Sequence, residues 1–216
     1  MSKNIALIGY MGSGKTTISQ LLQEQYDYKK FSFAKEVKDI FQLIYKTPIN
    51  KAIHRTVLQD IGRVLKKSMK QLDDYDYQCL HSWISQSQDF LKYFLSEINN
   101  DFEDIFTSDF YIQKTFNLPE FSMPYYKHNK ATVDDMRFSN EADMWRSYNT
   151  NSVVILLDCP KEVVIERLKL RDSTFDEKWL DDISETSFQS IKPNYIIDAT
   201  MPITDIMQEI ESFGIL

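Results

Sequence analysis

The sequence is poor in cysteine and carries no excess of basic residues. Its 216 residues include two cysteines, Cys79 and Cys159, too few and too far apart for a disulfide framework or a zinc site. The formal net charge is −7 and the pI is near 5.0. Proteins that coat nucleic acid neutralise phosphates with clustered lysine and arginine, so we expect no polynucleotide partner. A local basic pocket for a small phosphate compound is still compatible with this charge.

Long hydrophobic runs and glycine are also scarce. No apolar run approaches the length that spans a membrane, and the chain begins without a charged and then apolar leader. We therefore expect a cytoplasmic protein with no membrane partner. The histidines His54, His81 and His128 have no partners at the spacing of a metal site or a catalytic triad. Only five glycines occur, and three of them fall between residues 9 and 14.

The glycine-rich segment from Gly9 to Thr17 reads GYMGSGKTT and matches the pattern G-x-x-x-x-G-K-[ST] without a mismatch. Before it, Ile5–Ile8 is a short apolar run typical of a buried parallel strand. After it, Ile18 and Leu22 recur at helical spacing, with polar residues on the other face. A strand, a glycine loop and a helix are what a phosphate-binding loop requires, whereas a connecting turn requires no such flanks.

This loop predicts binding of a nucleoside triphosphate. Its glycines let several backbone N–H groups converge on phosphates at the positive end of a helix. Lys15 would reach the β- and γ-phosphates, and the hydroxyl group of Thr16 would be a ligand of Mg²⁺. The loop does not select a reaction, because kinases, hydrolases, switches and motors share it. The predicted ATP-binding residues of the loop are Gly12, Ser13, Gly14, Lys15, Thr16 and Thr17.

Strand and helix patterns alternate along the rest of the chain, with no buried strand expected between residues 35 and 130. Such alternation behind a phosphate loop predicts an α/β fold, a parallel sheet of about five strands flanked by helices. The predicted core comprises residues 1–34 and 131–216, and residues 35–130 form a helical insertion. The further expected strands cover residues 29–34, 131–138, 152–158 and 195–198, and the expected helices cover 35–47, 56–69, 78–98, 161–170 and 203–213.

Arg167 and Arg171 lie one helical turn apart after a strand that ends in Asp158-Cys159-Pro160. This segment resembles the strand, helix and lid entry of adenylate-kinase-like nucleoside monophosphate kinases. Both guanidinium groups project from one helix face, where they could hold ATP phosphates and neutralise charge on the transferred group. The alternative is a solvated helix whose arginines pair with neighbouring acidic residues.

A narrower resemblance begins at the segment DDMRFSNEAD, residues 134–143. It resembles the D-[VM]-R-F-P-N-E-A stretch of phage-type deoxynucleoside monophosphate kinases. Three further segments are similar to that family and follow in its order: LQDIGR at 58–63, DDISET at 181–186 and PNYIID at 193–198. The chain departs from the family at Ser139, where proline is usual, and at Asp182, where histidine is expected.

The resemblance implies a three-layer P-loop kinase fold with a substrate-binding insertion over residues 35–130 and a lid at about residues 171–190. It implies ATP-dependent, Mg²⁺-dependent phosphorylation of deoxynucleoside 5′-monophosphates to diphosphates. It also suggests a homodimer, located in the host cytoplasm if the protein is phage-encoded. No protein nucleophile is required, because a phosphate oxygen of the substrate attacks in line.

The candidate catalytic residues are cations, because two phosphates that approach one another need positive charge between them. Arg137 would face the acceptor phosphate, with Arg63 and Lys35 as candidates from the insertion; a surface charge is the alternative for each. Asp135 follows a strand next to the loop, where its carboxylate could hold a Mg²⁺-bound water or bind the substrate. The predicted catalytic set is Lys15, Arg137, Arg167 and Arg171, with Thr16 and Asp135 assigned to the metal.

The base pocket is assigned to Asn140, Glu141 and Trp145. Glu141 and Trp145 are one helical turn apart, so a hydrogen-bonding group and a stacking group would share one face. Packing in the core is an equal alternative for Trp145.

Three other functions are compatible with the loop. The acceptor could be another small phosphorylated or hydroxylated metabolite, although the DMRFSNE segment argues against this. The chain could be a nucleotide-hydrolysing switch or motor module, but its sequence gives no sign of a positioned water or a partner surface. Nucleotide binding without catalysis is the third, and the intact residues Lys15, Arg137 and Arg167 argue against it.

Overall fold

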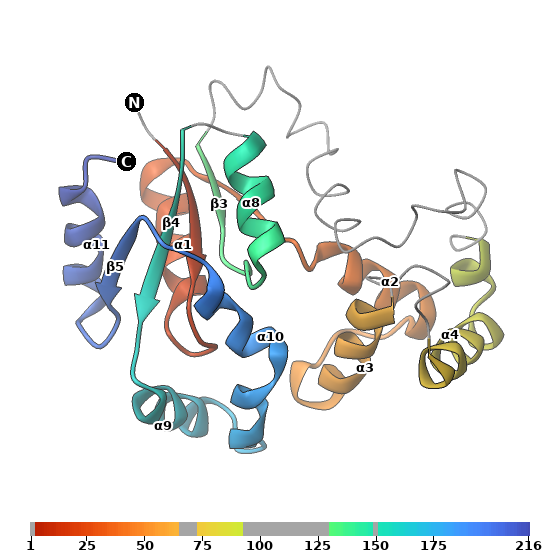
Figure 1. Ribbon diagram of the computed structural model, residues 1–216. Coiled ribbons are helices and arrows are strands. Elements are labelled where there is room, and N and C mark those ends of the chain that lie inside the picture. The colour runs from red at the N-terminus through yellow and green to blue at the C-terminus, as the bar shows by residue number, and fades with distance from the viewer. Residues whose placement is uncertain (1–2, 65–72, 93–129, 149–150) are drawn as a thin grey trace. The chain divides into compact units, whose positions relative to one another are not determined.

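The computed structural model describes residues 3–64, 73–92, 130–148 and 151–216. The chain forms two compact units, of which Met1–Phe33 and Asn117–Leu216 make the first and Ala34–Phe116 makes the second. All described strands belong to the first unit, and the described elements of the second unit are helices (Figure 1). The assignment of residues 35–130 to substrate binding stays a prediction.

The first unit is built on five parallel strands: β1 (Asn4–Ile8), β2 (Lys29–Phe31), β3 (Ala131–Val133), β4 (Ser152–Asp158) and β5 (Tyr195–Asp198). Their order is β2-β3-β1-β4-β5. β1 is central, and Ile5 lies in register between Thr132 of β3 and Val153 of β4. All five residues of β1 are buried, which explains its nearly continuous apolar sequence.

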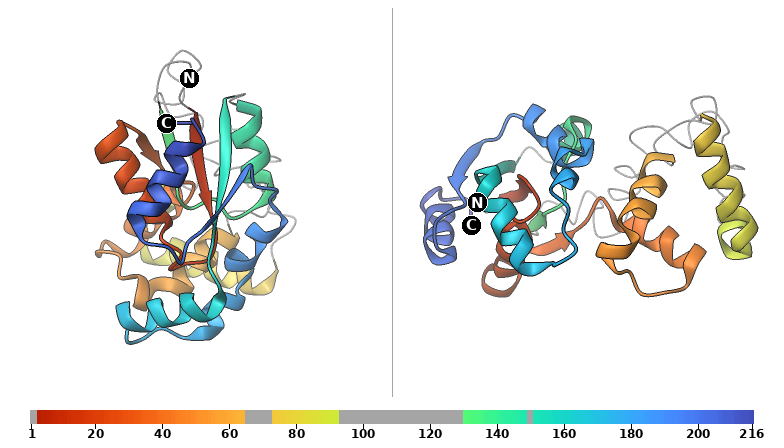
Figure 2. Two further views of the ribbon diagram at one scale, coloured as in Figure 1. Left: turned by 90° about the vertical axis from the view of Figure 1, so that its left-hand side faces the viewer. Right: turned by 90° about the horizontal axis from the view of Figure 1, so that it is seen from below.

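Helices cover both faces of this sheet. They are α1 (Lys15–Tyr26), α8 (Ser139–Tyr148), α9 (Lys161–Arg171) and α11 (Ile203–Ser212). α1 and α11 lie on one face and α8 lies on the other (Figures 1 and 2). The apolar stripe of α1, including Ile18 and Leu22, packs in one buried cluster with Leu7 and Ile155 of the sheet. This three-layer arrangement confirms the predicted α/β fold with a five-stranded parallel sheet.

The segment between α9 and β5 contains three short helical elements: η3 (Glu177–Asp181), α10 (Ile183–Thr186) and η4 (Ser187–Ser190). Asp182 is the N-cap of α10, and its Oδ1 accepts a hydrogen bond from the backbone N–H of Ser184 at 2.8 Å. An aspartate is among the best residues for this position. Asp182, which stands where histidine was expected, therefore has a local structural role as the cap of α10.

The second unit contains α2 (Lys35–Tyr45), α3 (Lys51–Val64) and α4 (Asp74–Gln86). Their facing stripes form a separate core that includes Ile40, Phe41, Ile61, Trp83 and Phe90. α4 begins with a capping box between Asp73 and Asp76, in which each side chain accepts a hydrogen bond from the other residue's backbone N–H. This unit therefore has a core of its own.

Several predicted boundaries are wrong. The strand expected over 131–138 ends at Val133, because the next two carboxylates turn away to bind Lys30 and Ser32. The helix expected over 78–98 begins earlier and is interrupted at Ser87, whose hydroxyl group accepts a hydrogen bond from the N–H of Phe90. No bounds were predicted for helix α8, although Glu141 and Trp145 were expected to lie one helical turn apart. Loops and short helices are expected over residues 101–130, of which residues 101–129 lie outside the described part of the chain. Among the described residues, no helix is long and apolar enough to cross a membrane.

Candidate active site

The phosphate loop connects the carboxyl end of β1 to α1, in the middle of the sheet (Figure 1). Gly9 has a φ of +135°, and a Cβ atom at this position would lie 2.6 Å from the carbonyl oxygen of Leu157 in β4. The chain can therefore pass this close to β4 only with glycine at residue 9. The match between the sequence pattern and this geometry supports the predicted loop.

The N-terminus of α1 offers its N–H groups to a ligand. Gly14 is the N-cap, with a φ of 97°, and makes no side-chain cap; the first turn of the helix contains no acidic residue. Uncapped N–H groups at the positive end of a helix favour an anion. In addition, the Oγ atom of Ser13 is buried and has no hydrogen-bond partner among the described residues. These features fit the phosphates of a nucleotide. The predicted ligands Thr16 and Thr17 are exposed at the start of the helix.

Lys15 is 7% exposed, and its Nζ atom donates hydrogen bonds to the carbonyl oxygens of Gly9 and Tyr10, at 2.7 and 2.6 Å. The pKa of its ammonium group is lowered from 10.5 to about 7, chiefly by burial and then by the nearby charge of Arg137. Glu185, Asp134 and Asp135 act in the opposite direction. The structure therefore brings Arg137 and three carboxylates within electrostatic range of the loop lysine.

Arg137 lies between β3 and α8 and is held at both ends. Its backbone N–H donates to Glu141 at 2.6 Å. Its Nη1 atom donates to the carbonyl oxygen of Ser184 and pairs with Oε1 of Glu185, both at 2.5 Å. Bonds of this charge-assisted kind are stronger than those between neutral groups. The arginine predicted to face the acceptor phosphate is thus fixed beside the phosphate loop.

No role for Glu185 was predicted from the sequence. Its side chain is 1% exposed, and its Oε2 atom accepts a hydrogen bond from the backbone N–H of Met11, at 3.0 Å. The same carboxylate therefore contacts the phosphate loop and Arg137. Glu185 belongs to the DDISET segment, which is similar to the kinase family named above. The sequence of this segment alone does not indicate a chemical role for its glutamate.

Asp134 and Asp135 follow β3 at the carboxyl edge of the sheet. Asp134 pairs with Lys30 at 2.6 Å, and Asp135 accepts hydrogen bonds from the hydroxyl group of Ser32 and the N–H of Phe33, at 2.5 and 3.0 Å. Asp134 therefore has a structural partner on β2, and Asp135 has partners on the segment that follows β2. Among the described residues, no group of three histidine, cysteine or acidic side chains could hold a metal ion.

The two arginines of α9 differ in environment. Arg167 is half-buried and its Nη1 atom lies 3.7 Å from Sγ of Cys159, at the end of β4. Arg171 is the last residue of the helix and is exposed. The pKa of Asp198 is held below its usual value by two hydrogen bonds from Thr200 and, to a smaller extent, by the charge of Arg167. Arg167 therefore lies near the carboxyl ends of β4 and β5.

The candidates from the insertion belong to the second unit and have partners within it. Lys35 is exposed and lies 3.9 Å from Asp39. Arg63 pairs with the fully buried carboxylate of Asp76 and with Asp60, and its guanidinium carbon is 4.9 Å from the centre of the Tyr75 ring. A role for either cation in binding an acceptor phosphate stays a prediction.

The polar residues predicted for the base pocket make local hydrogen bonds at the start of α8. Glu141 is 6% exposed, and its Oε2 atom accepts hydrogen bonds from the N–H groups of Arg137 and Phe138. Asn140 accepts a hydrogen bond from the N–H of Glu141. Trp145 is 1% exposed and is therefore a core residue in this structure, which was the alternative interpretation of its position.

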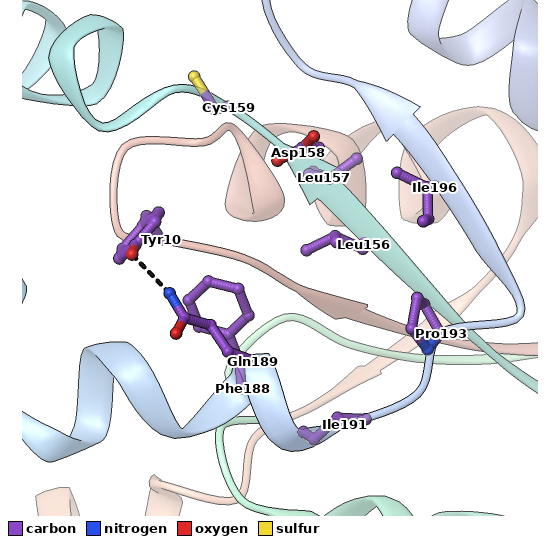
Figure 3. Close-up of a pocket in the computed structure, with 10 residues that line it drawn as sticks. All are labelled: Tyr10, Leu156, Leu157, Asp158, Cys159, Phe188, Gln189, Ile191, Pro193 and Ile196. Carbon is purple, nitrogen blue, oxygen red and sulfur yellow. Dashed lines mark hydrogen bonds between the residues drawn. The ribbon is translucent and has the colours of Figure 1, made fainter.

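A hollow of about 280 Å³ lies beside the loop, between Tyr10, β4 and the segment before β5 (Figure 3). At its edge, Nε2 of Gln189 donates a hydrogen bond to the hydroxyl group of Tyr10 at 2.7 Å. The ring of Phe188 meets the Tyr10 ring edge-on, with centroids 5.0 Å apart. The residues that line the hollow are mainly apolar, with Asp158 and Gln189 among the polar ones. The η4 segment thus holds the loop at Tyr10.

Solved structures with a similar arrangement include three small-molecule kinases. A sugar kinase from Janibacter sp. HTCC2649 has 11% identity over 98% of this chain and 94% of that chain, with a TM-score of 0.48. The shikimate kinase of Acinetobacter baumannii has 15% identity over 100% and 97%, with a TM-score of 0.44. The deoxyadenosine kinase of M. mycoides has 14% identity over 97% and 100%, with a TM-score of 0.44. Likeness at this level does not identify a substrate.

The sequence has no significant match among the curated proteins. A family model described as an AAA domain matches residues 5–189. The match begins in β1 and includes the phosphate loop, Arg137 and Glu185. Because it covers most of the chain, this protein belongs to the AAA domain family.

Proposed function

We propose that this protein is an ATP-dependent kinase that transfers the γ-phosphoryl group of ATP to the phosphate of a deoxynucleoside 5′-monophosphate. The observation that carries this proposal is the position of Arg137, which is bound to the same carboxylate as the N–H of Met11 in the phosphate loop. A module that only hydrolyses a nucleotide has no need of a second cation for an acceptor. A fixed arginine beside the loop is suited to bind the phosphate of such an acceptor.

On the donor side, the N–H groups of the loop and of the first turn of α1 bind the phosphates of ATP. The ammonium group of Lys15 turns from the carbonyl oxygens of its loop towards the β- and γ-phosphates. Arg167 and Arg171 add positive charge from α9, at the edge of the sheet where the loop lies. Catalysis then consists of positioning and electrostatic stabilisation of the transferred group, with no protein nucleophile.

Mg²⁺ fits the donors beside the loop. Thr16 supplies a hydroxyl group at the start of α1, and Asp135 supplies a carboxylate at the end of the neighbouring strand β3. Mg²⁺ keeps several waters and binds through one or two protein ligands together with phosphates, so a cluster of three side chains is not needed. Bound there, the ion would neutralise negative charge on the ATP phosphates.

On the acceptor side, Arg137 binds and orients the 5′-phosphate. Lys35 and Arg63 of the second unit add charge, and Asn140 and Glu141 at the start of α8 contribute to selection of the base. The segment over residues 171–190 serves as the lid and excludes water, which would otherwise hydrolyse ATP. The protein acts as a homodimer in this proposal.

The test is ADP formation from Mg²⁺·ATP with dTMP, dGMP, dCMP, dAMP and their ribonucleotide counterparts, with a control that lacks an acceptor. We expect ADP to depend on one or more deoxynucleotides. Equal ADP formation with and without acceptor would replace this proposal with a hydrolase or switch. ADP formation that depends only on other phosphorylated or hydroxylated metabolites would keep the kinase and reject the nucleotide acceptor.

A further inference from the structure

The carboxylate of Glu185 is a buried charge that contacts both the phosphate loop and Arg137. A carboxylate that is 1% exposed is costly unless charges and hydrogen bonds compensate for its desolvation. Its Oε1 atom pairs with Nη1 of Arg137 at 2.5 Å, and its Oε2 atom accepts from the N–H of Met11 at 3.0 Å. One rigid group therefore joins the arginine to the phosphate loop.

Hydrogen bonds also hold the backbone around Glu185. The N–H of Glu185 donates to the carbonyl oxygen of Asp182 at 2.9 Å, within the capped turn of α10. The carbonyl oxygen of Ser184 accepts a second bond from Nη1 of Arg137, at 2.5 Å. Arg137 is thus bound by two successive residues of α10, through a backbone group and a side chain.

The same segment contacts the phosphate loop a second time. Phe188 packs edge-on against Tyr10, and Gln189 donates a hydrogen bond to the Tyr10 hydroxyl group. Residues 184–189 therefore contact two consecutive loop residues, Tyr10 and Met11, in addition to Arg137. The loop and the arginine are separated by more than 120 residues in the sequence, and this segment connects them in the fold.

We propose that Glu185 is a positioning residue for phosphoryl transfer, because its carboxylate holds the loop that binds the donor and the arginine that receives the acceptor at a fixed separation. This inference rests on the proposed function for the role of Arg137. Transfer in line requires the reacting atoms to approach within about 3–3.5 Å, so errors of about 1 Å in either partner are costly. Glu185 acts through Met11 and Arg137 and does not touch the transferred group.

The chemistry of the side chain makes the inference specific. The N–H of Met11 and the guanidinium group of Arg137 are both donors, so the two side-chain atoms that face them must be acceptors. In Glu185→Gln, the amide NH₂ group would face either Met11 N–H or the Arg137 guanidinium, donor against donor. In Glu185→Asp, the charge is retained, but a chain shorter by one methylene group cannot reach both partners.

The experiment measures kcat and KM for the acceptor, and the Kd of a non-hydrolysable ATP analogue, in Glu185→Gln and Glu185→Asp. Glu24→Gln is the matched control, because Glu24 is exposed on α1, where its Oε1 atom accepts a hydrogen bond from Gln20, and it has no part in the proposed site. We expect kcat/KM for the acceptor to fall about 30-fold in Glu185→Gln, and the affinity for the analogue to fall about fivefold. The control should retain the wild-type constants, and wild-type constants in Glu185→Gln would overturn the inference.

A double-mutant cycle with Arg137→Ala separates positioning from a general loss of structure. If Glu185 acts through Arg137, Glu185→Gln should lower kcat/KM for the acceptor by less than about threefold once Arg137 is absent. Full multiplication of the two losses would show independent effects and would reject positioning. Circular dichroism and thermal unfolding are measured for each variant, and Glu185→Asp takes the place of Glu185→Gln in the cycle if the latter does not fold.

The design also distinguishes this inference from the proposed function. If the wild-type protein uses another acceptor, the cycle is measured with that acceptor, and the result still decides the role of Glu185. If the wild type transfers phosphate to no acceptor, the proposed function fails. The Met11 contact is then judged by the ATP analogue alone, and unchanged affinity in Glu185→Gln rejects the inference as well.

Discussion

The Nζ atom of Lys15 lies 2.6 Å from the carbonyl oxygen of Tyr10, so the ammonium group is hydrogen-bonded to its own loop. A second bond, to the carbonyl oxygen of Gly9 at 2.7 Å, also comes from the loop itself. The bonds also compensate a buried positive charge, which would otherwise be costly. The ammonium group of Lys15 therefore lies within the predicted phosphate-binding loop.

The first prediction concerns Lys15→Ala. We expect ADP formation to fall by about three orders of magnitude, because the charge on the β- and γ-phosphates loses its partner. The melting temperature should stay the same or rise, since removal of a buried ammonium group removes a desolvation cost. Lys169→Ala is the control, because that lysine lies in an exposed ion pair on α9. Near-normal turnover of folded Lys15→Ala protein would reject the loop as the nucleotide site.

The second prediction compares two glycines with positive φ. In Gly9→Ala, the new Cβ atom would lie 2.6 Å from the carbonyl oxygen of Leu157, so the loop must move. We expect a loss of about 2–4 kcal/mol in the free energy of unfolding, together with loss of ATP binding. In Gly214→Ala, the φ of +64° is also unfavourable, but apart from the adjoining residues no atom of the described part of the chain lies within 4 Å of the new Cβ atom.

Urea unfolding of both variants measures this difference. Gly214→Ala should cost about 1 kcal/mol, the ordinary penalty of a left-handed conformation. Equal losses in the two proteins would mean that the close approach to Leu157 contributes nothing beyond the backbone conformation.

The elements that could be predicted are those with a local cause. The apolar runs of β4 and β5 gave their positions almost to the residue, and the GYMGSGKTT pattern gave the loop and the start of α1. Alternation of strands and helices then gave the parallel sheet. In each case, the residues that determine the element lie within it.

The parts that could not be predicted depend on contacts between distant segments. Met11 and Glu185 are 174 residues apart, and no local pattern shows that a carboxylate in a four-residue helix meets a loop N–H. The burial of Trp145 and the pairing of Arg63 with Asp76 have the same origin, since each depends on which neighbours the fold supplies. The strand after residue 130 ends early for a similar reason, because Asp134 pairs with Lys30.

The third prediction concerns pH and Tyr28. Its hydroxyl group lies 2.9 Å from the carbonyl oxygen of Lys3 and 3.2 Å from that of Ile215, and burial raises the pKa of this phenol above its usual value. Because the folded state holds the proton more tightly, the stabilisation is complete below the unfolded pKa of about 10 and is lost as the pH rises above it. In Tyr28→Phe, this dependence should disappear.

Urea unfolding at pH 7, 9 and 11 tests this sign. At pH 7, Tyr28→Phe should be less stable than the wild type by about 1 kcal/mol, because a buried hydrogen bond is lost. The difference in the free energy of unfolding should narrow or reverse by pH 11, because Tyr28 then ionises in the unfolded wild type and stabilises that state. A difference that stays constant from pH 7 to pH 11 would contradict the raised pKa.

The fourth prediction concerns Arg63, which pairs with the fully buried carboxylate of Asp76. Arg63→Ala leaves that charge without its cation, so we expect the free energy of unfolding to fall by about 3 kcal/mol. Lys46→Ala in the same unit is the control, because its ion pair with Asp89 is exposed and should contribute at most about 1 kcal/mol.

The same pair can separate a structural role of Arg63 from a role in binding the acceptor. Asp76→Asn removes the buried charge, and its remaining oxygen can still accept the N–H of Asp73 in the capping box. In the double variant Arg63→Ala/Asp76→Asn, we therefore expect part of the lost stability to return. If Arg63 binds the acceptor phosphate, the KM for the acceptor stays raised about tenfold in this double variant, because the cation is still missing. If the KM for the acceptor returns to the wild-type value together with the stability, Arg63 acts only through the fold of its own unit. Of the two arginines, only Arg137 would then bind the acceptor phosphate.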